Sequence, residues 1–340
     1  MPDGNAEGQA TIMEIQRAVW RFAAIRALVA IGAPGQLRDG PITVAELADR
    51  CGAHAPTLGR LLRTIAATGL LRSAGPGTYE LTRDGQALLA GRAVVSVRFS
   101  VDPEVWGALG DLTETVRTGV APFTHRHGSL YDYLSTKPEV SAVFDELMDI
   151  NHGPLAVRLA EVATFPDTGT VVDVGGGQGT FLAAILRARP GLRGILLDLA
   201  RTVPSARKYL AGSGVGERCE VVAGDFFTTV PAGGDAYLVA HVVHNWDDEQ
   251  ATDILRTIRA VMPGHAQLLV VEAPLPDDDR PAFGKDLDIR LLTMHEGKER
   301  SHAEYSALLT GAGFRPGQVV ELGRGECAIT ASPAASPAGA

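Results

Sequence analysis

The stretch Asp173-Val174-Gly175-Gly176-Gly177-Gln178-Gly179 decides the fold of this chain. Val171 to Val174 form a β-rich run that predicts a buried strand, and Phe181 to Ala188 predict a helix directly after the glycines. Glycine lets the backbone turn sharply and come close to a ligand at the N-terminus of the helix. We therefore expect a strand, a glycine-rich loop and a helix that together hold a small molecule.

Short β-rich runs alternate with helical runs after Thr170. Further strands are predicted at 194–197, 219–222, 236–239 and 267–271. Because strands separated by helices pair in parallel, this half is α/β, with a doubly wound sheet that binds its ligand beyond the carboxyl ends of the strands. The last two runs flank Gly323-Arg324-Gly325 and predict a hairpin that adds an antiparallel edge strand.

The first hundred residues have a different pattern. An amphipathic helix is predicted by apolar residues spaced three and four apart, namely Ile12, Ile15, Val19 and Phe22. The capping box Thr43-Val-Ala-Glu46 opens a second helix that ends near Gly52, and a third, with Pro56 in its first turn, ends near Gly69. A small β-hairpin follows, with its turn at 75–77. Three helices and a hairpin in this order predict a winged helix.

The predicted organisation has four parts. A winged-helix domain spans 1–100, a helical connector 101–165 and the doubly wound domain 166–332, and a disordered tail spans 333–340. The apolar-poor segments from Met1 to Gly8 and from Ala331 onward are expected to be loose, since they cannot offset the entropy lost on ordering.

Composition excludes several classes of protein. The 340 residues are 45% hydrophobic with a formal charge of −9, and no uncharged apolar run approaches the ~20 residues of a membrane span. Three distant cysteines indicate neither a disulfide framework nor a thiolate zinc site. We expect a cytosolic protein with no membrane partner. The acidic charge, and the presence of only Arg60 and Arg63 on the second helix of the helix-turn-helix, argue against a nucleic-acid partner.

The glycine spacing restricts the choice of cofactor. Thr180 stands where a dinucleotide fingerprint has its last glycine, which disfavours NAD and a dehydrogenase. Asp198 closes the next strand 25 residues after Asp173, a position from which a carboxylate accepts hydrogen bonds from ribose hydroxyls. His241 and His244 have an H-x-x-H spacing, but no third ligand with suitable spacing follows, so we predict no metal.

Five motifs occur together in the order and spacing of a known family: 173–179, Leu197-Asp198-Leu199, Gly224-Asp225-Phe226-Phe227, His244 to Glu249 and Gly297-Lys298-Glu299-Arg300-Ser301. In these motifs the chain resembles the S-adenosylmethionine-dependent O-methyltransferases of plant phenylpropanoid and bacterial aromatic-polyketide metabolism. The resemblance runs from about Ile12 to Thr330. It implies a Rossmann-like class I methyltransferase sheet after a winged-helix dimerisation domain, and methylation of a phenolic hydroxyl in antibiotic-type biosynthesis.

The resemblance also implies roles for particular residues. His244 is the general base and is flanked by Glu272 and Glu299. S-adenosyl-L-methionine, which leaves as S-adenosyl-L-homocysteine, is held by a set of residues along the sheet edge, namely Asp173, Gly175, Gly177, Asp198, Asp225 and Phe226. Ala240 replaces the Lys or Arg of many relatives, and we expect His241 to take over that contact.

An aromatic substrate suits the predicted pocket. By position, its walls are Trp106, Phe123, Met148, Asn245, Leu291 and Met294. Relatives dimerise through their N-terminal helices, and the apolar face of Ile12 to Phe22 is poorly covered in a monomer, so a homodimer is expected.

Two other functions remain open at this stage. One is a non-methylating hydroxylase or decarboxylase of the same family, which has no need of a base at His244. The other is a DNA-binding regulator that combines the winged helix with a ligand-sensing α/β domain.

Overall fold

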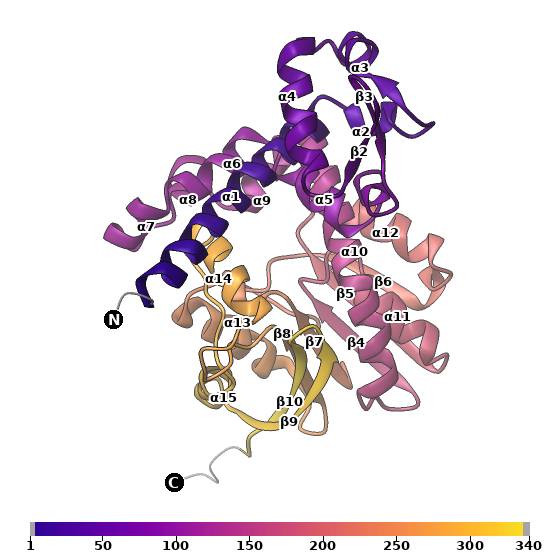
Figure 1. Cartoon of the computed structure of the whole chain (residues 1–340). Coiled ribbons are helices and arrows are strands. Elements are labelled where there is room, and N and C mark those ends of the chain that lie inside the picture. Colours follow the sequence, from indigo (N-terminus) through magenta and orange to yellow (C-terminus); the bar gives the residue numbers. More distant parts are fainter. Residues whose placement is uncertain (1–3, 336–340) are drawn as a thin grey trace. The chain divides into compact units, whose positions relative to one another are not determined.

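The computed structural model describes residues 4–335 and divides them into two compact units. The first unit comprises residues 4–106 together with Ala142–Leu147, and the second comprises Gly107–Ser141 and residues 148–335. Figure 1 shows the elements of both. No helix within residues 4–335 has the length and apolar character needed to cross a membrane.

The first unit is a winged helix that follows a long N-terminal helix. Its elements are α1 (Gly4–Ala30), α2 (Ala33–Gln36), β1 (Ile42–Thr43), α3 (Val44–Cys51), α4 (Ala55–Ala66), β2 (Leu71–Gly75), β3 (Thr78–Leu81), the 3-10 helix η1 (Asp84–Leu88) and α5 (Arg92–Phe99). The predicted hairpin is β2 and β3, and β1 pairs with β3 to make a three-stranded antiparallel sheet. Leu47, Leu62 and Ile65 from α3 and α4 form the centre of its core.

The expected capping box of α3 is only half formed. The Thr43 hydroxyl accepts a hydrogen bond from the Glu46 backbone N–H at 3.2 Å. The Glu46 side chain, instead of returning to Thr43, forms an ion pair with Arg50 one turn later, at 2.5 Å. Pairs at this spacing face each other on a helix, so the salt bridge competes with the second half of the box. The helix ends as predicted, with Gly52 in the left-handed conformation (φ 62°).

The second unit begins with helices, as expected for the connector. They are α6 (Pro103–Gly110), which begins in the first unit, and α7 (Leu112–Thr118), α8 (Pro122–His127), α9 (Leu130–Ser135) and α10 (Pro138–Val162). Part of α10, Ala142–Leu147, belongs to the first unit, so the connector does not form a third compact unit.

The sheet domain alternates strands and helices as predicted. Its elements are β4 (Gly169–Val174), α11 (Thr180–Ala188), β5 (Leu192–Asp198), α12 (Val203–Gly212), η2 (Gly216–Arg218), β6 (Cys219–Ala223), β7 (Ala236–Ala240), η3 (Val243–Asn245), α13 (Asp248–Val261), β8 (Gln267–Glu272), α14 (Phe283–Met294), α15 (His302–Gly311), β9 (Phe314–Gly323) and β10 (Glu326–Pro333). The strand order is β6-β5-β4-β7-β8-β10-β9. The first five strands are parallel, and β10 and β9 are antiparallel.

Apolar side chains point alternately to the two faces along each strand, and they form two cores, one on each face of this sheet. Val171 packs with apolar residues of α11 and α12, whereas its neighbour Val172 packs with residues of α13 and α15. Successive side chains of a strand point to opposite faces, and both faces are covered here. The strands therefore lie between two layers of helices, which can be followed in Figure 1.

The two ends are more ordered than predicted. Helix α1 begins at Gly4 rather than after Gly8, and β10 continues to Pro333. Ala331 is buried at 3% exposure, because β10 lies between β8 and β9 and pairs with both. The remainder of the expected tail, 336–340, lies outside the described residues.

Gly179 sits where the glycine loop passes into α11. Its φ is +91°, and a Cβ there would lie 2.9 Å from methyl carbons of both Leu196 and Leu210. Only glycine satisfies the backbone angle and the close packing together.

We predict that Gly179→Ala lowers the free energy of unfolding by about 1–3 kcal/mol, since it adds both backbone strain and overpacking. Gly212→Ala is the matched control, because Gly212 lies in α12 and a Cβ added there would have no heavy atom within 4 Å. Urea unfolding followed by circular dichroism measures both variants. Equal stability of Gly179→Ala and the native protein would contradict the expected strain.

Candidate functional site

The centre of the site is the imidazole of His244, in the short turn η3 after β7. Its Nδ1 atom donates a hydrogen bond to Glu299 Oε1 at 2.7 Å and lies 3.1 Å from Glu272 Oε2. Both glutamate side chains are fully buried, and the His244 side chain is 9% exposed. The structure thus brings together the three residues that the sequence proposed for catalysis.

The two carboxylates determine the state of this ring. Because carboxylates only accept hydrogen bonds, Nδ1 carries the proton in the neutral ring, and Nε2 is the nitrogen left for a substrate. Burial by itself lowers the pKa of His244, but the charges of Glu272 and Glu299 outweigh it and raise that pKa to about 9. Burial also raises the pKa of Glu272.

Neighbouring backbone and side chains hold both acids in place. Glu272 is the last residue of β8, and its Oε1 accepts the His244 backbone N–H at 3.3 Å. Glu299 donates its own backbone N–H to Asp288 on α14 at 2.8 Å, and its Oε2 accepts from the Tyr305 hydroxyl at 3.5 Å. Each carboxylate therefore has a second contact that restricts its orientation.

Two residues hold the segment around Glu299 against the turn that carries His244, and neither was assigned a role from the sequence. Arg300 has no exposed surface, and its guanidinium donates to the carbonyls of Val243 and Trp246 at 3.2 and 2.8 Å. A Cβ on Gly297 would lie 2.0 Å from the His244 carbonyl, so only glycine permits this approach. Both lie in the motif around Glu299, but only contacts between distant segments show what they do.

The glycine loop lies beside an acid without a partner. Asp173 is buried at 1% exposure, and neither of its carboxylate oxygens has a hydrogen-bond partner among the described residues. Burial, together with the charge of Asp198, raises the pKa of Asp173 to about 7. A cationic amino group fits this carboxylate, because an unpaired buried charge is costly and a charged donor relieves it.

The backbone of the loop leaves room for a ligand on one side only. A Cβ at Gly176 would lie 2.5 Å from Asp173 Oδ2, and one at Gly175 would lie 2.9 Å from Val242 and 3.3 Å from the Phe226 ring. Gly177, with φ +58°, has no heavy atom within 4 Å on its Cβ side. The loop is closely packed against the protein at 175–176 and open at 177.

Asp198 and Asp225 stand at the ends of the next two strands, as predicted. Asp198 is half-buried, and its two oxygens accept the backbone N–H groups of Gly177 and Leu199 at 2.8 and 2.7 Å. Asp225 is exposed, and its carboxylate accepts from Phe227 N–H at 2.9 Å. Phe226 is half-buried and lies against the glycine loop, so these three predicted residues surround the open side of the sheet edge.

His241 lies deeper than a cofactor contact at a pocket rim. It adopts an unusual left-handed conformation (φ 53°), and its ring stacks on His152 of α10 at 4.4 Å between centroids. Its Nε2 lies 3.1 Å from Glu326 Oε2. With His244 and Glu272 it brings three potential ligand atoms within 4.8 Å, but His244 Nδ1 already donates to Glu299, so we interpret the group as acid–imidazole contacts.

The residues predicted to line the substrate pocket lie on different elements and make different contacts. Leu291 and Met294 are buried on α14, and Met148 is half-buried on α10. Asn245 donates to the Tyr131 hydroxyl at 3.2 Å and to the His241 carbonyl at 3.1 Å. Phe123 packs edge-on against Tyr133 in the helical core.

Trp106 belongs to the first unit, where its ring stacks on Phe22 at 5.6 Å and lies 5.0 Å below the Arg26 guanidinium carbon. Its role as a pocket wall, like that of Phe123, stays a prediction.

Tyr131 and His295 are further groups near the site that the sequence did not single out. Their rings lie 6.4 Å apart, edge to face. Burial, with the charge of Asp198, raises the pKa of Tyr131 to about 12, and burial, with His244 and Arg290, lowers that of His295 to about 3. Both side chains are therefore neutral hydrogen-bonding groups near neutral pH.

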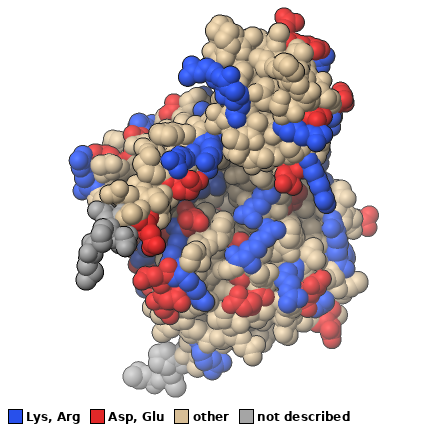
Figure 2. All heavy atoms as spheres, viewed as in Figure 1, with Lys and Arg blue, Asp and Glu red and all other residues tan. Residues whose placement is uncertain are grey.

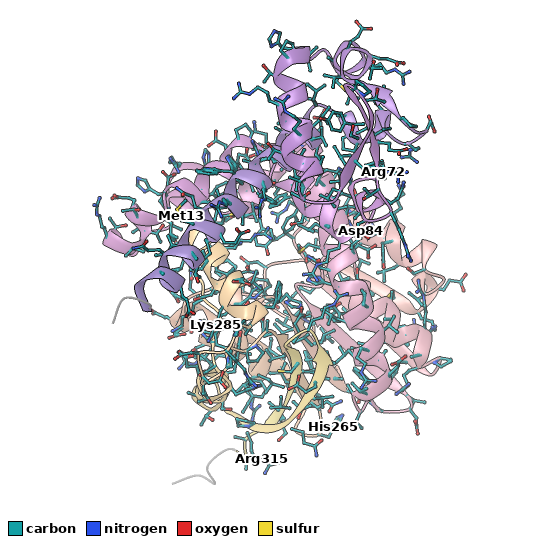
Figure 3. The ribbon with its side chains drawn as sticks, in the orientation of Figure 1. Met13, Arg72, Asp84, His265, Lys285 and Arg315 are labelled. Atoms are coloured by element: carbon teal, nitrogen blue, oxygen red, sulfur yellow. The ribbon has the colours of Figure 1, made fainter. Side chains whose placement is uncertain are left out.

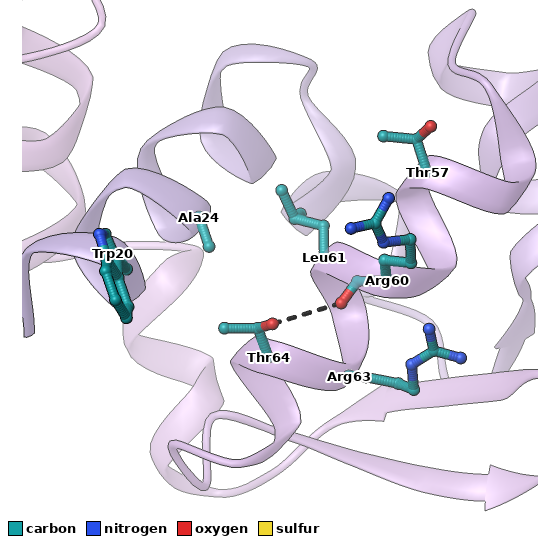
Figure 4. Close-up of a pocket in the computed structure, with 7 residues that line it drawn as sticks. All are labelled: Trp20, Ala24, Thr57, Arg60, Leu61, Arg63 and Thr64. Carbon is teal, nitrogen blue, oxygen red and sulfur yellow. Dashed lines mark hydrogen bonds between the residues drawn. The ribbon is translucent and has the colours of Figure 1, made fainter. Parts of the chain in front are cut away.

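Two other features of the described residues lack this chemistry. His265, labelled in Figure 3, bonds to Asp235 at 3.0 Å and precedes β8, at the opposite end of that strand from Glu272. A groove of about 650 Å³ lies between α1 and α4 in the first unit, as Figure 4 shows. Its lining is Trp20, Ala24, Thr57, Arg60, Leu61, Arg63 and Thr64, which includes none of the predicted catalytic residues.

A doubly wound sheet with an antiparallel last pair, a glycine loop and an acid at each of several strand ends defines a class I methyltransferase. The chain belongs to the O-methyltransferase family. The family profile of the O-methyltransferase domain matches residues 106–315, and that of the O-methyltransferase dimerisation domain matches residues 13–91.

Individual relatives cover nearly the whole chain. The mitomycin biosynthesis 6-O-methyltransferase of Streptomyces lavendulae is 37% identical over 95% of this chain and 94% of its own length. The structure of a mitomycin 7-O-methyltransferase is similar with a TM-score of 0.92 and 35% identity, over 97% of this chain and 99% of the other.

Two further relatives bear on cofactor and reaction. An O-methyltransferase from neocarzinostatin biosynthesis, solved with S-adenosylmethionine and 2-hydroxy-5-methyl naphthoic acid, has a TM-score of 0.82 and 32% identity over 92% of this chain and 95% of the other. Aclacinomycin 10-hydroxylase of Streptomyces purpurascens is 33% identical over 86% of this chain and 80% of its own length. Most of the relatives are thus named O-methyltransferases of secondary metabolism, and S-adenosylmethionine, bound in the neocarzinostatin structure, is the cofactor of this family.

The state of Asp173 leads to a pH-dependent affinity for the cofactor. An ammonium group binds the ionised carboxylate, so we expect affinity to rise from about pH 5.5 to about pH 7 as Asp173 loses its proton, before an α-amino group itself titrates near 8. Asp173→Asn is expected to bind about 10–100-fold more weakly and without this rise. Calorimetry with S-adenosylhomocysteine measures both. A constant affinity of the native protein across this range would argue against an Asp173 contact.

Proposed function

We propose that the protein transfers the methyl group of S-adenosylmethionine to a phenolic hydroxyl of an aromatic small molecule, with His244 as general base. The observation that carries this proposal is the contact of His244 Nδ1 with both Glu299 and Glu272, at 2.7 and 3.1 Å. Such an arrangement sets the tautomer and orients the ring, which leaves Nε2 as the proton acceptor. The naphthoic acid bound by the neocarzinostatin relative supports a planar aromatic acceptor.

The residues of the chain supply positioning and proton transfer. S-adenosylmethionine supplies, when bound, an electrophilic methyl carbon on a sulfonium sulfur. A phenol has a pKa near 10, so most of it is protonated at neutral pH and its oxygen is a weak nucleophile. His244 Nε2 takes the phenolic proton as the oxygen attacks, and the carboxylates of Glu272 and Glu299 stabilise the imidazolium that results.

The cofactor assignments rest on the chemistry of the donor set. Asp173 offers a buried acceptor and Gly177 an open backbone for the amino acid end, and Gly175, packed against Val242 and Phe226, shapes the turn between them. Asp198 offers carboxylate oxygens to ribose, and Phe226, beside Asp225, offers a ring face to adenine. His241 lies away from this role, because its ring nitrogens face Glu326 and Glu272.

His244→Ala should lower methyl transfer by about 10²- to 10⁴-fold and leave cofactor affinity unchanged, because the ring acts on the acceptor. The matched control is His265→Ala, which removes an exposed imidazole far along the strand from the site. Turnover of a panel of hydroxylated naphthoates and phenazines with methyl-labelled cofactor, beside calorimetry, measures the two effects. Full turnover in His244→Ala would exclude His244 as the base.

The 10-hydroxylase relative favours one other function for the same fold. Hydroxylation does not require removal of a phenolic proton, so an unmethylated, oxygenated product detected by mass spectrometry would support that function. Methyl transfer is favoured instead by the contacts of His244 with Glu272 and Glu299, which suit a general base.

The first unit gives little support to a DNA-binding regulator. Arg60 and Arg63 of α4 lie at the groove beside Trp20 rather than in a basic stripe (Figure 4). Lys and Arg are interspersed with Asp and Glu on the face shown in Figure 2. The absence of a nucleic-acid or membrane partner and a cytosolic location stay predictions.

We further propose a homodimer formed through α1. The predicted apolar face is exposed, with Ile12 at 68%, Ile15 at 62% and Val19 at 54%. Met13, labelled in Figure 3, and Trp20 on the same helix are 43% and 58% exposed. A contiguous apolar face of this kind is typical of a protein interface, and the match to the dimerisation domain supports it.

Ile15→Glu should convert the dimer into a monomer, because it buries an unpaired charge in the interface and weakens association by at least about 100-fold. Ala10→Glu adds the same charge on the opposite, exposed side of α1 and serves as control. Sedimentation equilibrium at micromolar concentration measures the mass against 35.7 kDa per chain. A native protein that sediments as a monomer would contradict the proposal.

A further inference from the structure

A phenol ring from α9 reaches the end of the sheet where the proposed base lies. Tyr131 is half-buried, and its hydroxyl contacts the side-chain amide of Asn245, the residue directly after His244, at 3.2 Å. Burial, together with the negative charges of Asp198 and Glu272, raises the pKa of Tyr131 to about 12. The hydroxyl therefore keeps its hydrogen at neutral pH, within electrostatic reach of both the proposed cofactor residues and the acids of the base.

A second contact of Asn245 fixes the direction of this hydrogen bond. Asn245 Nδ2 also lies 3.1 Å from the His241 carbonyl oxygen, and a carbonyl oxygen only accepts, so the nitrogen of the amide faces both partners. An amide nitrogen only donates, so the Tyr131 oxygen accepts from it. The hydroxyl hydrogen of Tyr131 consequently points away from Asn245.

The amide of Asn245 thus decides what Tyr131 can do. A carboxylate at this position would only accept, and it would take the hydroxyl hydrogen of Tyr131 for itself. With Asn245 in place, Tyr131 acts as a donor toward a third group. The contact also ties this donor to the turn η3, which carries the proposed base.

Positive charges gather around the same ring. The guanidinium carbon of Arg201, in the loop after Asp198, lies 5.4 Å from the centre of the Tyr131 ring. Arg290 on α14 is half-buried, and its charge acts on both Tyr131 and His295. Burial lowers the pKa of Arg290, but a guanidinium stays charged near neutral pH. A neutral donor beside two cations suits a negatively charged acceptor of hydrogen bonds.

The acids nearest to this ring are held by other donors. Asp198 accepts the backbone N–H groups of Gly177 and Leu199, and Glu272 contacts the imidazole of His244. These contacts direct both carboxylates toward the glycine loop and the base rather than toward Tyr131. Among the anionic groups of a small ligand, a carboxylate has two acceptor oxygens and so matches a hydroxyl and a guanidinium together.

We propose that Tyr131, turned by Asn245, donates its hydroxyl hydrogen to a carboxylate of the aromatic acceptor, so that the enzyme selects hydroxylated aromatic acids. The inference rests on the proposed function, since the carboxylate belongs to the methyl acceptor. Arg290 adds charge attraction to the same group, and removal of the phenolic proton stays with His244. Tyr131 is thus a specificity-determining residue and not the base.

The test compares the binding of aromatic acids with the binding of a neutral phenol. The probes are 3-hydroxy-2-naphthoate, 6-hydroxy-2-naphthoate and 2-naphthol, titrated by calorimetry into the protein saturated with S-adenosylhomocysteine. We expect the native protein to bind at least one of the acids about 10-fold or more tightly than 2-naphthol. In Tyr131→Phe, which keeps the ring and removes only the hydroxyl, this preference should fall about 10-fold, while the affinity for 2-naphthol stays unchanged. Tyr79→Phe, on β3 of the first unit, is the matched control and should keep the native preference.

A double-mutant cycle separates the direction of the hydrogen bond from the effect of added charge. Asn245→Asp should lower the preference too, because the introduced carboxylate takes the hydroxyl hydrogen of Tyr131. In that background, the further change Tyr131→Phe should alter the preference less than about 2-fold. If Asn245→Asp acted only through its charge, Tyr131→Phe would cost as much as in the native protein, and this result would overturn the inference.

Two further outcomes decide the inference and the proposed function separately. A native protein without preference for either acid, or an unchanged preference in Tyr131→Phe, would contradict the inference. A preference that depends on Tyr131, with no methyl transfer to either acid or to any other phenol tested, would instead contradict the proposed function and leave Tyr131 as a carboxylate contact.

Discussion

Two fully buried carboxylates converge on a single imidazole nitrogen, and much of the second unit serves to keep them there. Burying an acid is unfavourable unless a charged or hydrogen-bonding partner is held in good geometry. Glu272 and Glu299 each have such a partner in His244 Nδ1, at 3.1 and 2.7 Å. The cost of holding two negative charges out of water explains why cations and donors gather around them.

The sheet provides the geometry that this convergence needs. His244 follows β7, and Glu272 ends the neighbouring β8, so the parallel pairing of these strands places the two side chains at the same edge. Glu299 comes from a loop that Arg300 ties to the turn carrying His244. The glycine loop after β4 opens at that edge too, which brings the cofactor residues and the base to one end of the sheet.

The acids also connect the chemistry to stability. Arg300 and Gly297 are needed to bring the Glu299 loop against the His244 turn, and a change at either affects packing and catalysis together. The same low-dielectric surroundings strengthen every charge contact in the cluster, so the state of His244 depends on the acids around it. A site of this kind is tuned by residues that never touch the substrate.

Much of the fold was predictable, because strand and helix periodicity and the glycine loop are local signals. The family resemblance also implied His244, Glu272 and Glu299, and the structure places them together. The half-formed capping box at Thr43 and the ordered Ala331 were not predictable, since each depends on a competing ion pair or on pairing with distant strands. Glu326 carries no sequence signal at all, because it looks like an ordinary polar residue after a turn.

The amino-acid sequence by itself determined the order of the elements, the glycine turn and the residue types available for acid–base chemistry, since these depend on neighbours within a few positions. Only the tertiary structure decided that Glu326 and His241 lie behind Glu272 and that Arg300 is buried. The physical reason is that burial and the distance between charges arise from the pairing of β8 with β10 and from loop packing, which join residues more than fifty positions apart.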